Sequence, residues 1–122
     1  MVIPIETGLG QLHGRDSIYL DSEQFDESHQ KLTLAGEING NLCANQKVDK
    51  FIPYSVCFLN VVRYEKTELD EWLNLDKPLF HESSSFYLLD NSDGKRTFVL
   101  RTYDWVYEIR CDSFELNFNQ NT

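Results

Sequence analysis

Apolar side chains in the last third of the chain alternate with polar ones, and the alternation changes parity near residue 101. The apolar positions before this point are the even-numbered Phe98 and Leu100, and those after it are the odd-numbered Trp105, Tyr107, Ile109 and Cys111. A single continuous strand cannot make this change without a bulge, because successive side chains point to opposite faces of a sheet. A turn at residues 103–104 explains both parities. The cross-strand pairs that it predicts are Phe98 with Ile109, Leu100 with Tyr107, Val99 with Glu108, Thr97 with Arg110 and Arg101 with Val106.

Two further turns extend this hairpin. The segment Ser84 to Asp90 precedes a turn that contains Gly94, and it predicts a strand that pairs with the next one. Loop length leaves the register of the Ser84 to Thr102 hairpin open. A turn at residues 112–113 places the following strand beside the previous one, with its apolar side chains on the same face, namely Phe114, Leu116 and Phe118. We therefore expect a C-terminal meander of four antiparallel strands.

Patterns nearer the N-terminus predict two more strands and a helix. Leu32 to Leu42 carries apolar residues at even positions, which is typical of a half-buried strand. Asn39-Gly40 is a hairpin signal inside it, so the segment either turns there or continues. Pro53 to Tyr64 is apolar at both parities, which predicts a central strand covered on both faces. A capping signal followed by helical spacing predicts one short helix near Glu68 to Leu73.

The chain of 122 residues has room for one domain. Residues 1–31 are punctuated by proline and glycine and predict an irregular segment with one short strand, Ser17 to Leu20. Residues 32–122 form the predicted β core. The fold class that follows is mainly β, an antiparallel sandwich or open barrel of about six to eight strands with one short helix.

The chain carries twenty acidic residues, eleven lysines and arginines and a net charge of −9, spread over both halves of the sequence. Such a field repels phosphate backbones and anionic lipid headgroups, so neither nucleic acid nor a membrane is expected as a partner. A basic protein is the partner that this field attracts. Glu68 to Asp76 is one acidic stretch. The densest one has no base within it and contains Asp16, Asp21, Glu23, Asp26 and Glu27.

The cysteines and the apolar segments indicate in which compartment of the cell the protein is expected. No stretch approaches the roughly 18 apolar residues of a membrane span, and Met1 to Gly10 lacks the pattern of a signal peptide. The three cysteines cannot all pair within the chain, and none stands in a Cys-x-x-Cys arrangement. We therefore expect reduced thiols and a cytoplasmic protein.

The residue types that carry catalysis form no recognisable constellation. His81 stands beside Glu82 and three serines, but immediate neighbours rarely face one another and no nucleophile elbow surrounds them. Cys43 is the one thiol in a polar stretch. Asp90 to Gly94 fails as a calcium loop, because leucines occupy its first and twelfth ligand positions. Zinc-ligand spacings and phosphate-binding glycine loops are also missing, so we expect no metal, no cofactor and no catalytic residue.

Two functions follow from these observations. The first is a non-enzymatic acidic interaction domain for a basic partner. In overall character the chain resembles bacterial immunity and inhibitor proteins, although no residue motif carries the likeness. The second is a small-ligand-binding β domain whose pocket is lined by Phe98, Trp105 and Tyr107. The predicted pairing places these three among core side chains, which favours the first function.

Overall fold

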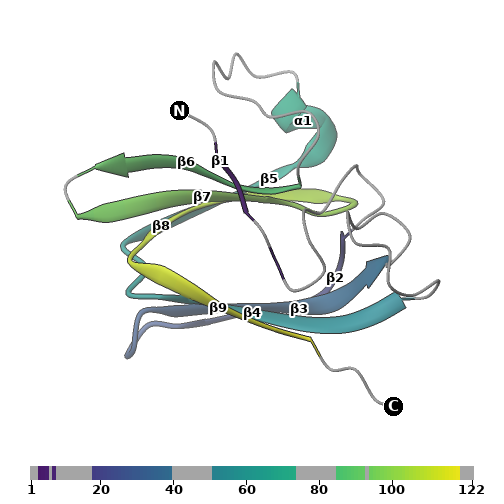
Figure 1. The fold of residues 1–122 in the computed structure, drawn as a ribbon, viewed down its shortest axis with the longest axis horizontal. Coiled ribbons are helices and arrows are strands. Elements are labelled where there is room, and N and C mark those ends of the chain that lie inside the picture. Colours follow the sequence, from purple (N-terminus) through teal and green to yellow (C-terminus); the bar gives the residue numbers. More distant parts are fainter. Residues whose placement is uncertain are drawn as a thin grey trace.

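The computed structural model describes residues 3–5, 7, 18–39, 51–73, 85–92 and 94–118. Their strands form two antiparallel sheets that face each other as a sandwich and do not close into a barrel (Figure 1). The first sheet has the order β1 (Ile3–Pro4), β6 (Phe86–Ser92), β7 (Lys95–Arg101), β8 (Trp105–Cys111) and β5 (Arg63–Glu68). The second has the order β2 (Ile18–Asp26), β3 (Lys31–Asn39), β4 (Phe51–Leu59) and β9 (Ser113–Phe118). The mainly β single-domain fold with one short helix, α1 (Leu69–Leu73), is therefore confirmed.

Strands β7 and β8 form the hairpin that the parity change predicts. Phe98 lies opposite Ile109, and the other four predicted pairs are present as well. Thr102 closes the turn, because its hydroxyl accepts a hydrogen bond from the Trp105 N–H at 3.0 Å. The two sets of apolar residues therefore share the face that looks toward the second sheet.

The pairing of β6 with β7 gives the register of the Ser84 to Thr102 hairpin, which the sequence left open. Phe86 and Leu88 face the second sheet, whereas Tyr87 pairs with Val99 on the outer face. The outer face has its own apolar cluster, which consists of Leu69, Trp72, Tyr87, Val99 and Val106. Both parities of β6 are apolar because the first sheet is covered on one side by the second sheet and on the other by α1 (Figure 1).

Helix α1 depends on this outer cluster. A five-residue helix is not stable alone, since the cost of nucleation exceeds what so few hydrogen bonds return. Leu69 and Trp72 are buried against the first sheet. The indole N–H of Trp72 also donates a hydrogen bond to the Glu108 carboxylate at 3.0 Å. Packing against β8 and its neighbours therefore holds the helix in place.

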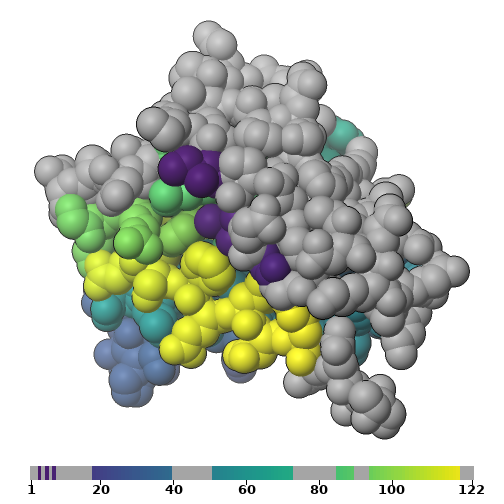
Figure 2. All heavy atoms as spheres, viewed as in Figure 1, coloured from purple at the N-terminus to yellow at the C-terminus, as the bar shows by residue number. Residues whose placement is uncertain are grey.

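The fourth strand of the predicted meander is present, but the predicted pairing of β8 with β9 is wrong. β9 pairs with β4 in the second sheet, where Phe114 lies opposite Phe58. The chain crosses between the sheets at Asp112, whose N–H donates to the Leu59 carbonyl at 3.0 Å. Phe114 still packs on the core, because the inward positions change from odd numbers in β8 to even numbers in β9 at this crossing. Figure 2 shows atoms of the C-terminal part of the chain, in yellow, at the surface.

Pro53 to Tyr64 is likewise two strands rather than the one central strand that was predicted. β4 ends at Leu59, Asn60 adopts a left-handed φ of 57°, and β5 begins at Arg63 in the other sheet. Side chains of β4 alternate between buried and more exposed ones. The strand is therefore covered on its inner face, and the run of apolar residues at both parities comes from the crossing between sheets.

Strand β2 is longer than the predicted short strand from Ser17 to Leu20. A bulge between Leu20 and Ser22 shifts its register against β3, so the period-two pattern is broken in the sequence. The residues after the bulge are polar apart from Phe25. The possible turn at Asn39-Gly40 and its continuation to Leu42 lie outside the described residues.

The space between the sheets is filled by one apolar cluster from both of them. Four phenylalanine rings contact one another at its centre, with centroid distances from 4.9 to 6.2 Å, and belong to Phe58, Phe86, Phe98 and Phe114. Edge-to-face and tilted ring pairs of this kind add to the free energy gained from burial. This core therefore holds the two sheets against each other.

Candidate partner-binding surface

The edge strands β2 and β5 lie on the same flank of the sandwich, one in each sheet, and side chains connect them. Residues 18–30 contain β2 and its turn and carry four acids and no lysine or arginine. Residues 63–73 contain β5 and α1 and carry four acids and two bases. Residues 94–118, in contrast, carry four of each. The fold therefore gathers negative charge on one flank, and we call residues 18–30 and 63–73 the acidic flank.

Glu23 points from β2 into the space between the two sheets. It lies opposite the buried Leu34, and opposite residues of an antiparallel pair face the same side. Its carboxylate accepts hydrogen bonds from the Tyr107 hydroxyl and, at 3.3 Å, from the Tyr64 hydroxyl. The Lys66 Nζ atom lies 3.3 Å from Glu23 Oε1. One carboxylate thus joins β2 to both β5 and β8.

Lys66 is held between this carboxylate and an aromatic ring. Its Nζ atom lies 4.2 Å from the ring centroid of Trp105 and 5.9 Å from that of Tyr107. Both distances fall within the range of cation–π attraction. A carboxylate on one side and the face of an indole on the other favour a positively charged group at this position.

The contacts of Glu23 determine its ionisation. Partial burial raises the pKa of this carboxyl, but the hydrogen bonds from Tyr107 and Lys66, the charge of Lys66 and the bond from Tyr64 outweigh burial. The pKa of Glu23 therefore lies below its ordinary value. Burial, together with the bond to Glu23, raises the pKa of both tyrosines. At neutral pH the carboxylate is charged and both hydroxyls are donors.

A groove runs beside this cluster along the edge of β2. It has a volume of about 210 Å³ and is lined by Leu20, Asp21, Ser22, Glu23, Lys66 and Trp105. Pockets for drug-sized ligands have volumes of about 300 to 1,000 Å³. The groove is therefore of a size for a single side chain of a partner.

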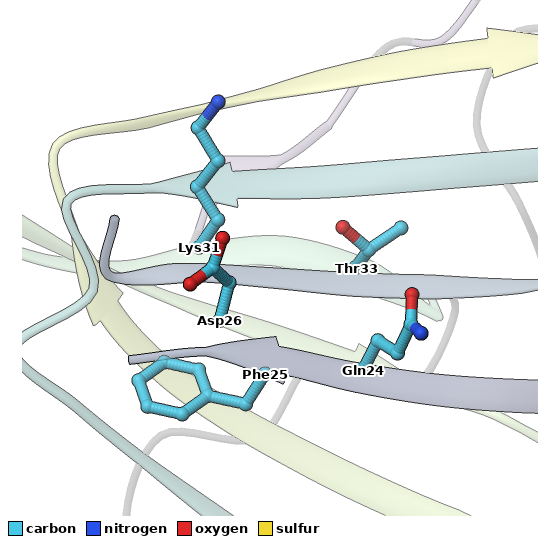
Figure 3. Close-up of a pocket in the computed structure, with 5 residues that line it drawn as sticks. All are labelled: Gln24, Phe25, Asp26, Lys31 and Thr33. Carbon is cyan, nitrogen blue, oxygen red and sulfur yellow. The ribbon is translucent and has the colours of Figure 1, made fainter. Parts of the chain in front are cut away.

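The β2–β3 turn borders a second depression, with a volume of about 370 Å³ (Figure 3). Figure 3 shows that its polar side chains lie on one side of the hairpin, while Phe25 points the other way. The Phe25 ring contacts the Tyr64 ring at a centroid distance of 5.3 Å. This depression is therefore a polar surface of the hairpin, separated by the strands from the Glu23 cluster.

Asp26 serves the turn itself. Its Oδ1 atom accepts hydrogen bonds from the N–H groups of Ser28 at 3.0 Å and His29 at 3.4 Å, and its Oδ2 atom lies 2.8 Å from His29 Nδ1. The hydrogen bond from the His29 ring is the largest of the causes that hold the pKa of Asp26 below its ordinary value. A carboxylate with these local partners stabilises the hairpin rather than presenting a free charge to a partner.

The structure separates the predicted acidic residues into three surroundings. Asp16 lies outside the described residues. Glu23 is held between the sheets and Asp26 in the turn. The side chains of Asp21 and Glu27 are exposed, and Asp21 lines the groove.

The three residues of the predicted ligand pocket also lie in different surroundings. Phe98 is buried among the core phenylalanines. The ring of Tyr107 is buried, and its hydroxyl reaches Glu23. Trp105 alone lines the groove. The two predicted sites therefore meet at the groove, where Glu23 comes from one and Trp105 from the other.

Sequence reasoning missed Tyr64 and Lys66. The signal was present, because Lys66 stands at the same parity as Tyr64 within a strand and so carries a charge on the inward side. Inward-pointing charges are typical of edge strands. Reading Pro53 to Tyr64 as one strand hid this pattern.

Two candidates for catalysis, Cys43 and His81, lie outside the described residues. Burial, more than the nearby Asp112 charge, raises the pKa of the Cys111 thiol to about 11, so it is protonated at neutral pH and is no nucleophile. Within the described ranges, no group of three His, Cys, Asp or Glu side chains is placed to hold a metal ion. The part of the chain that the structure describes also has no helix of the length and apolar character needed to cross a membrane.

The chain matches no family model, and neither a curated protein nor a solved structure matches it. The function of the acidic flank is therefore inferred from the chemistry of its own residues.

Proposed function

We propose that the protein is a non-enzymatic interaction domain that binds a basic protein through the acidic flank, as an inhibitor or immunity protein does. The support is the net charge of −9 and its uneven distribution over the fold, since residues 18–30 carry four acids and no lysine or arginine. A field of this sign steers a cationic partner toward the flank and raises the rate of encounter.

The observation that carries the proposal is the position of the Lys66 ammonium group. It lies in the groove 3.3 Å from Glu23 and 4.2 Å from the centre of the Trp105 ring. The groove thus already accommodates a cation from within the chain. The exposed carboxylate of Asp21 lines the same groove and is available to a lysine or arginine of a partner.

Acidic side chains on an edge strand have a second role, because they oppose pairing with the edge of another sheet. The two roles depend on different residues. Opposition to pairing rests on the inward charges of Glu23 and Lys66, whereas binding of a partner rests on exposed acids such as Asp21 and Glu27. Substitution of one of these exposed acids, Glu27, therefore tests binding alone.

A small-ligand-binding domain is the alternative, with a pocket lined by Phe98, Trp105 and Tyr107. It has less support, because Phe98 contacts other core rings and the Tyr107 hydroxyl is engaged by Glu23. The acidic flank is thus the better-supported binding surface.

The test compares two charge reversals that leave the same net charge. Glu27→Lys lies on the acidic flank, and Glu115→Lys lies on β9, at the opposite edge of the second sheet; both side chains are exposed. Each protein is immobilised and exposed to native lysate at low and at high salt, and mass spectrometry quantifies the retained proteins. We expect the wild type to retain basic proteins at low salt and to lose them at high salt, because salt shortens the Debye length to about 8 Å at physiological strength.

We expect Glu27→Lys to reduce this retention several-fold and Glu115→Lys to leave it close to the wild-type level. Equal effects of the two reversals would show that only net charge matters and would contradict the proposal. Retention that persists at high salt, or no retention of basic proteins at low salt, would also contradict it.

A further inference from the structure

Three aromatic rings from distant parts of the chain meet at one end of the sandwich. Tyr19 of β2 stacks on Tyr103 of the β7–β8 turn, with ring centroids 5.3 Å apart and an interplanar angle of 21°. Phe51 of β4 meets Tyr19 edge-on at 5.5 Å. We call Tyr19, Phe51 and Tyr103 the aromatic anchor. Residues 19, 51 and 103 are brought together only by the folded sheets.

Two of these rings are open to solvent. Phe51 is 48% exposed and Tyr103 is 39% exposed. Clustered exposed rings have a cost in water, and rigid aromatic side chains of this kind are enriched where proteins bind one another. Tyr19 is less exposed and forms the platform for the other two.

Carboxylates lie next to the aromatic anchor. The exposed Glu37 is the cross-strand partner of Tyr19 on β3, so both point to the same side of the sheet. The exposed Asp104 follows Tyr103 in the same turn. Asp21, which lines the groove, is two residues from Tyr19. The aromatic anchor therefore has the exposed carboxylates of Glu37 and Asp104 as neighbours in the sheet and in the turn.

We propose that the aromatic anchor binds an arginine side chain of the basic partner. This inference rests on the proposed function and adds the residue that the partner inserts. A guanidinium group is planar and weakly hydrated, so it stacks on aromatic rings while its N–H groups reach neighbouring carboxylates. An ammonium group is strongly hydrated and lacks a planar face, so the aromatic anchor favours arginine over lysine.

Tyr103 also holds the turn in place, and this role can be separated from binding. Its backbone N–H donates to the Ile18 carbonyl at 2.7 Å, and that bond does not depend on the ring. Tyr103→Ala and Phe51→Ala therefore remove exposed rings while the backbone contact stays. Val62→Ala is the matched control, because Val62 is 53% exposed and lies at the β4–β5 crossing.

The experiment uses two peptides of equal length and equal positive charge, one with arginines and one with lysines. Calorimetry at low salt measures their dissociation constants for the wild type, the two ring variants and the control. We expect the wild type to bind the arginine peptide about two- to five-fold more tightly, as exposed cation–π contacts predict. Each ring variant is expected to lose this preference without weakening the lysine peptide, and Val62→Ala is expected to keep it.

The outcomes separate the two proposals. Equal binding of both peptides by the wild type, or a preference that both ring variants retain, overturns the aromatic anchor and leaves the acidic flank standing. No binding of either peptide overturns both. Tyr103→Phe, which keeps the ring, serves as the conservative variant and is expected to keep the arginine preference. Circular dichroism checks that every variant is folded.

Discussion

Glu23 and Asp21 are two residues apart on the same strand, yet their chemistry differs. Asp21 is exposed beside the groove, whereas Glu23 is turned between the sheets and retains 28% of its side-chain exposure. Two tyrosine hydroxyls and one ammonium group converge on it. In the sequence the two acids belong to one cluster. The bulge at Asp21 and the partners that Glu23 meets from the other sheet give them separate roles.

At the residue scale we expect Glu23→Gln to change how stability depends on pH. The pKa of Glu23 is lowered in the folded state from an ordinary value of 4.5. The unfolded chain therefore takes up its proton first as the pH falls, and the stability that Glu23 contributes is complete above 4.5 and is lost below it, through the lowered value.

Urea unfolding measures this effect. At neutral pH we expect Glu23→Gln to lower the free energy of unfolding by about 1 kcal/mol, less than a buried charged hydrogen bond because solvent reaches the carboxylate. The difference from the wild type is expected to shrink at acidic pH. Asp21→Asn removes a charge from the same strand without touching Tyr64 or Tyr107 and is the control. A difference that stays constant with pH would contradict the assigned contacts.

At the scale of elements, the β2–β3 hairpin depends on a close approach at Gly36. A Cβ atom at this position would lie 1.9 Å from the Tyr19 carbonyl oxygen. That oxygen accepts a hydrogen bond from the Tyr54 hydroxyl at 3.2 Å, and the β2 bulge follows directly. Gly36 thus leaves room for the backbone of β2 where the strand changes register.

We expect Gly36→Ala to lower the free energy of unfolding by at least about 2 kcal/mol, because the added methyl group meets backbone rather than a side chain that can move. Chemical denaturation measures the loss. Ser55→Ala alters a partly buried residue of the neighbouring strand β4, and we expect it to change stability by less than about 0.5 kcal/mol. A Gly36→Ala protein as stable as the control would show that β2 does not approach Gly36 this closely.

Elements were predictable from the sequence where local pattern decides them. The β7–β8 register followed from parity, and α1 from a capping signal and helical spacing. The pairing of β9 was not predictable, because parity states which side chains face inward and not which sheet receives them. β2 was cut short because an inward-facing Glu23 and a bulge hide its alternation.

The candidate site was partly predictable, because local patterns in the sequence identify single residues but not the order of the strands. Composition identified Asp21 and Glu23, and alternation identified Trp105 and Tyr107. Their meeting depends on β2 and β5 being edges on the same flank, which is a property of strand order. The aromatic anchor shares this dependence, since its three rings come from β2, β4 and a turn.

At the scale of the whole molecule, each sheet ends in two edge strands within the part of the chain that the structure describes. Edge strands present unpaired backbone groups that other sheets can join. Glu23 on β2 and Lys66 on β5 place opposite charges inward at two of these edges and bind each other there. A strand that joined either edge would cover a charged pair that water now reaches.

We expect the double variant Glu23→Leu with Lys66→Leu to associate more strongly than the wild type, because both edges lose the charge that opposes pairing. Sedimentation velocity over a range of concentrations measures the association. The control is Arg63→Leu with Glu65→Leu, which changes the same charges on the outer face of β5. If the control associates as strongly as the inward variant, exposed leucine rather than an unprotected edge is the cause.

Several contacts join the strands at the end of the sandwich where the chain crosses from β4 to β5 and from β8 to β9. Asn60 Nδ2 donates to the Asp112 carboxylate at 2.8 Å, and Lys95 forms an ion pair with the same carboxylate at 2.7 Å. The Val61 N–H donates to the Gln30 carbonyl at 2.8 Å. The β4–β5 and β8–β9 crossings and the β2–β3 and β6–β7 turns thus converge at this end. The layers are therefore joined at both ends, because beside the aromatic anchor the Tyr103 N–H donates to the Ile18 carbonyl of the other sheet at 2.7 Å.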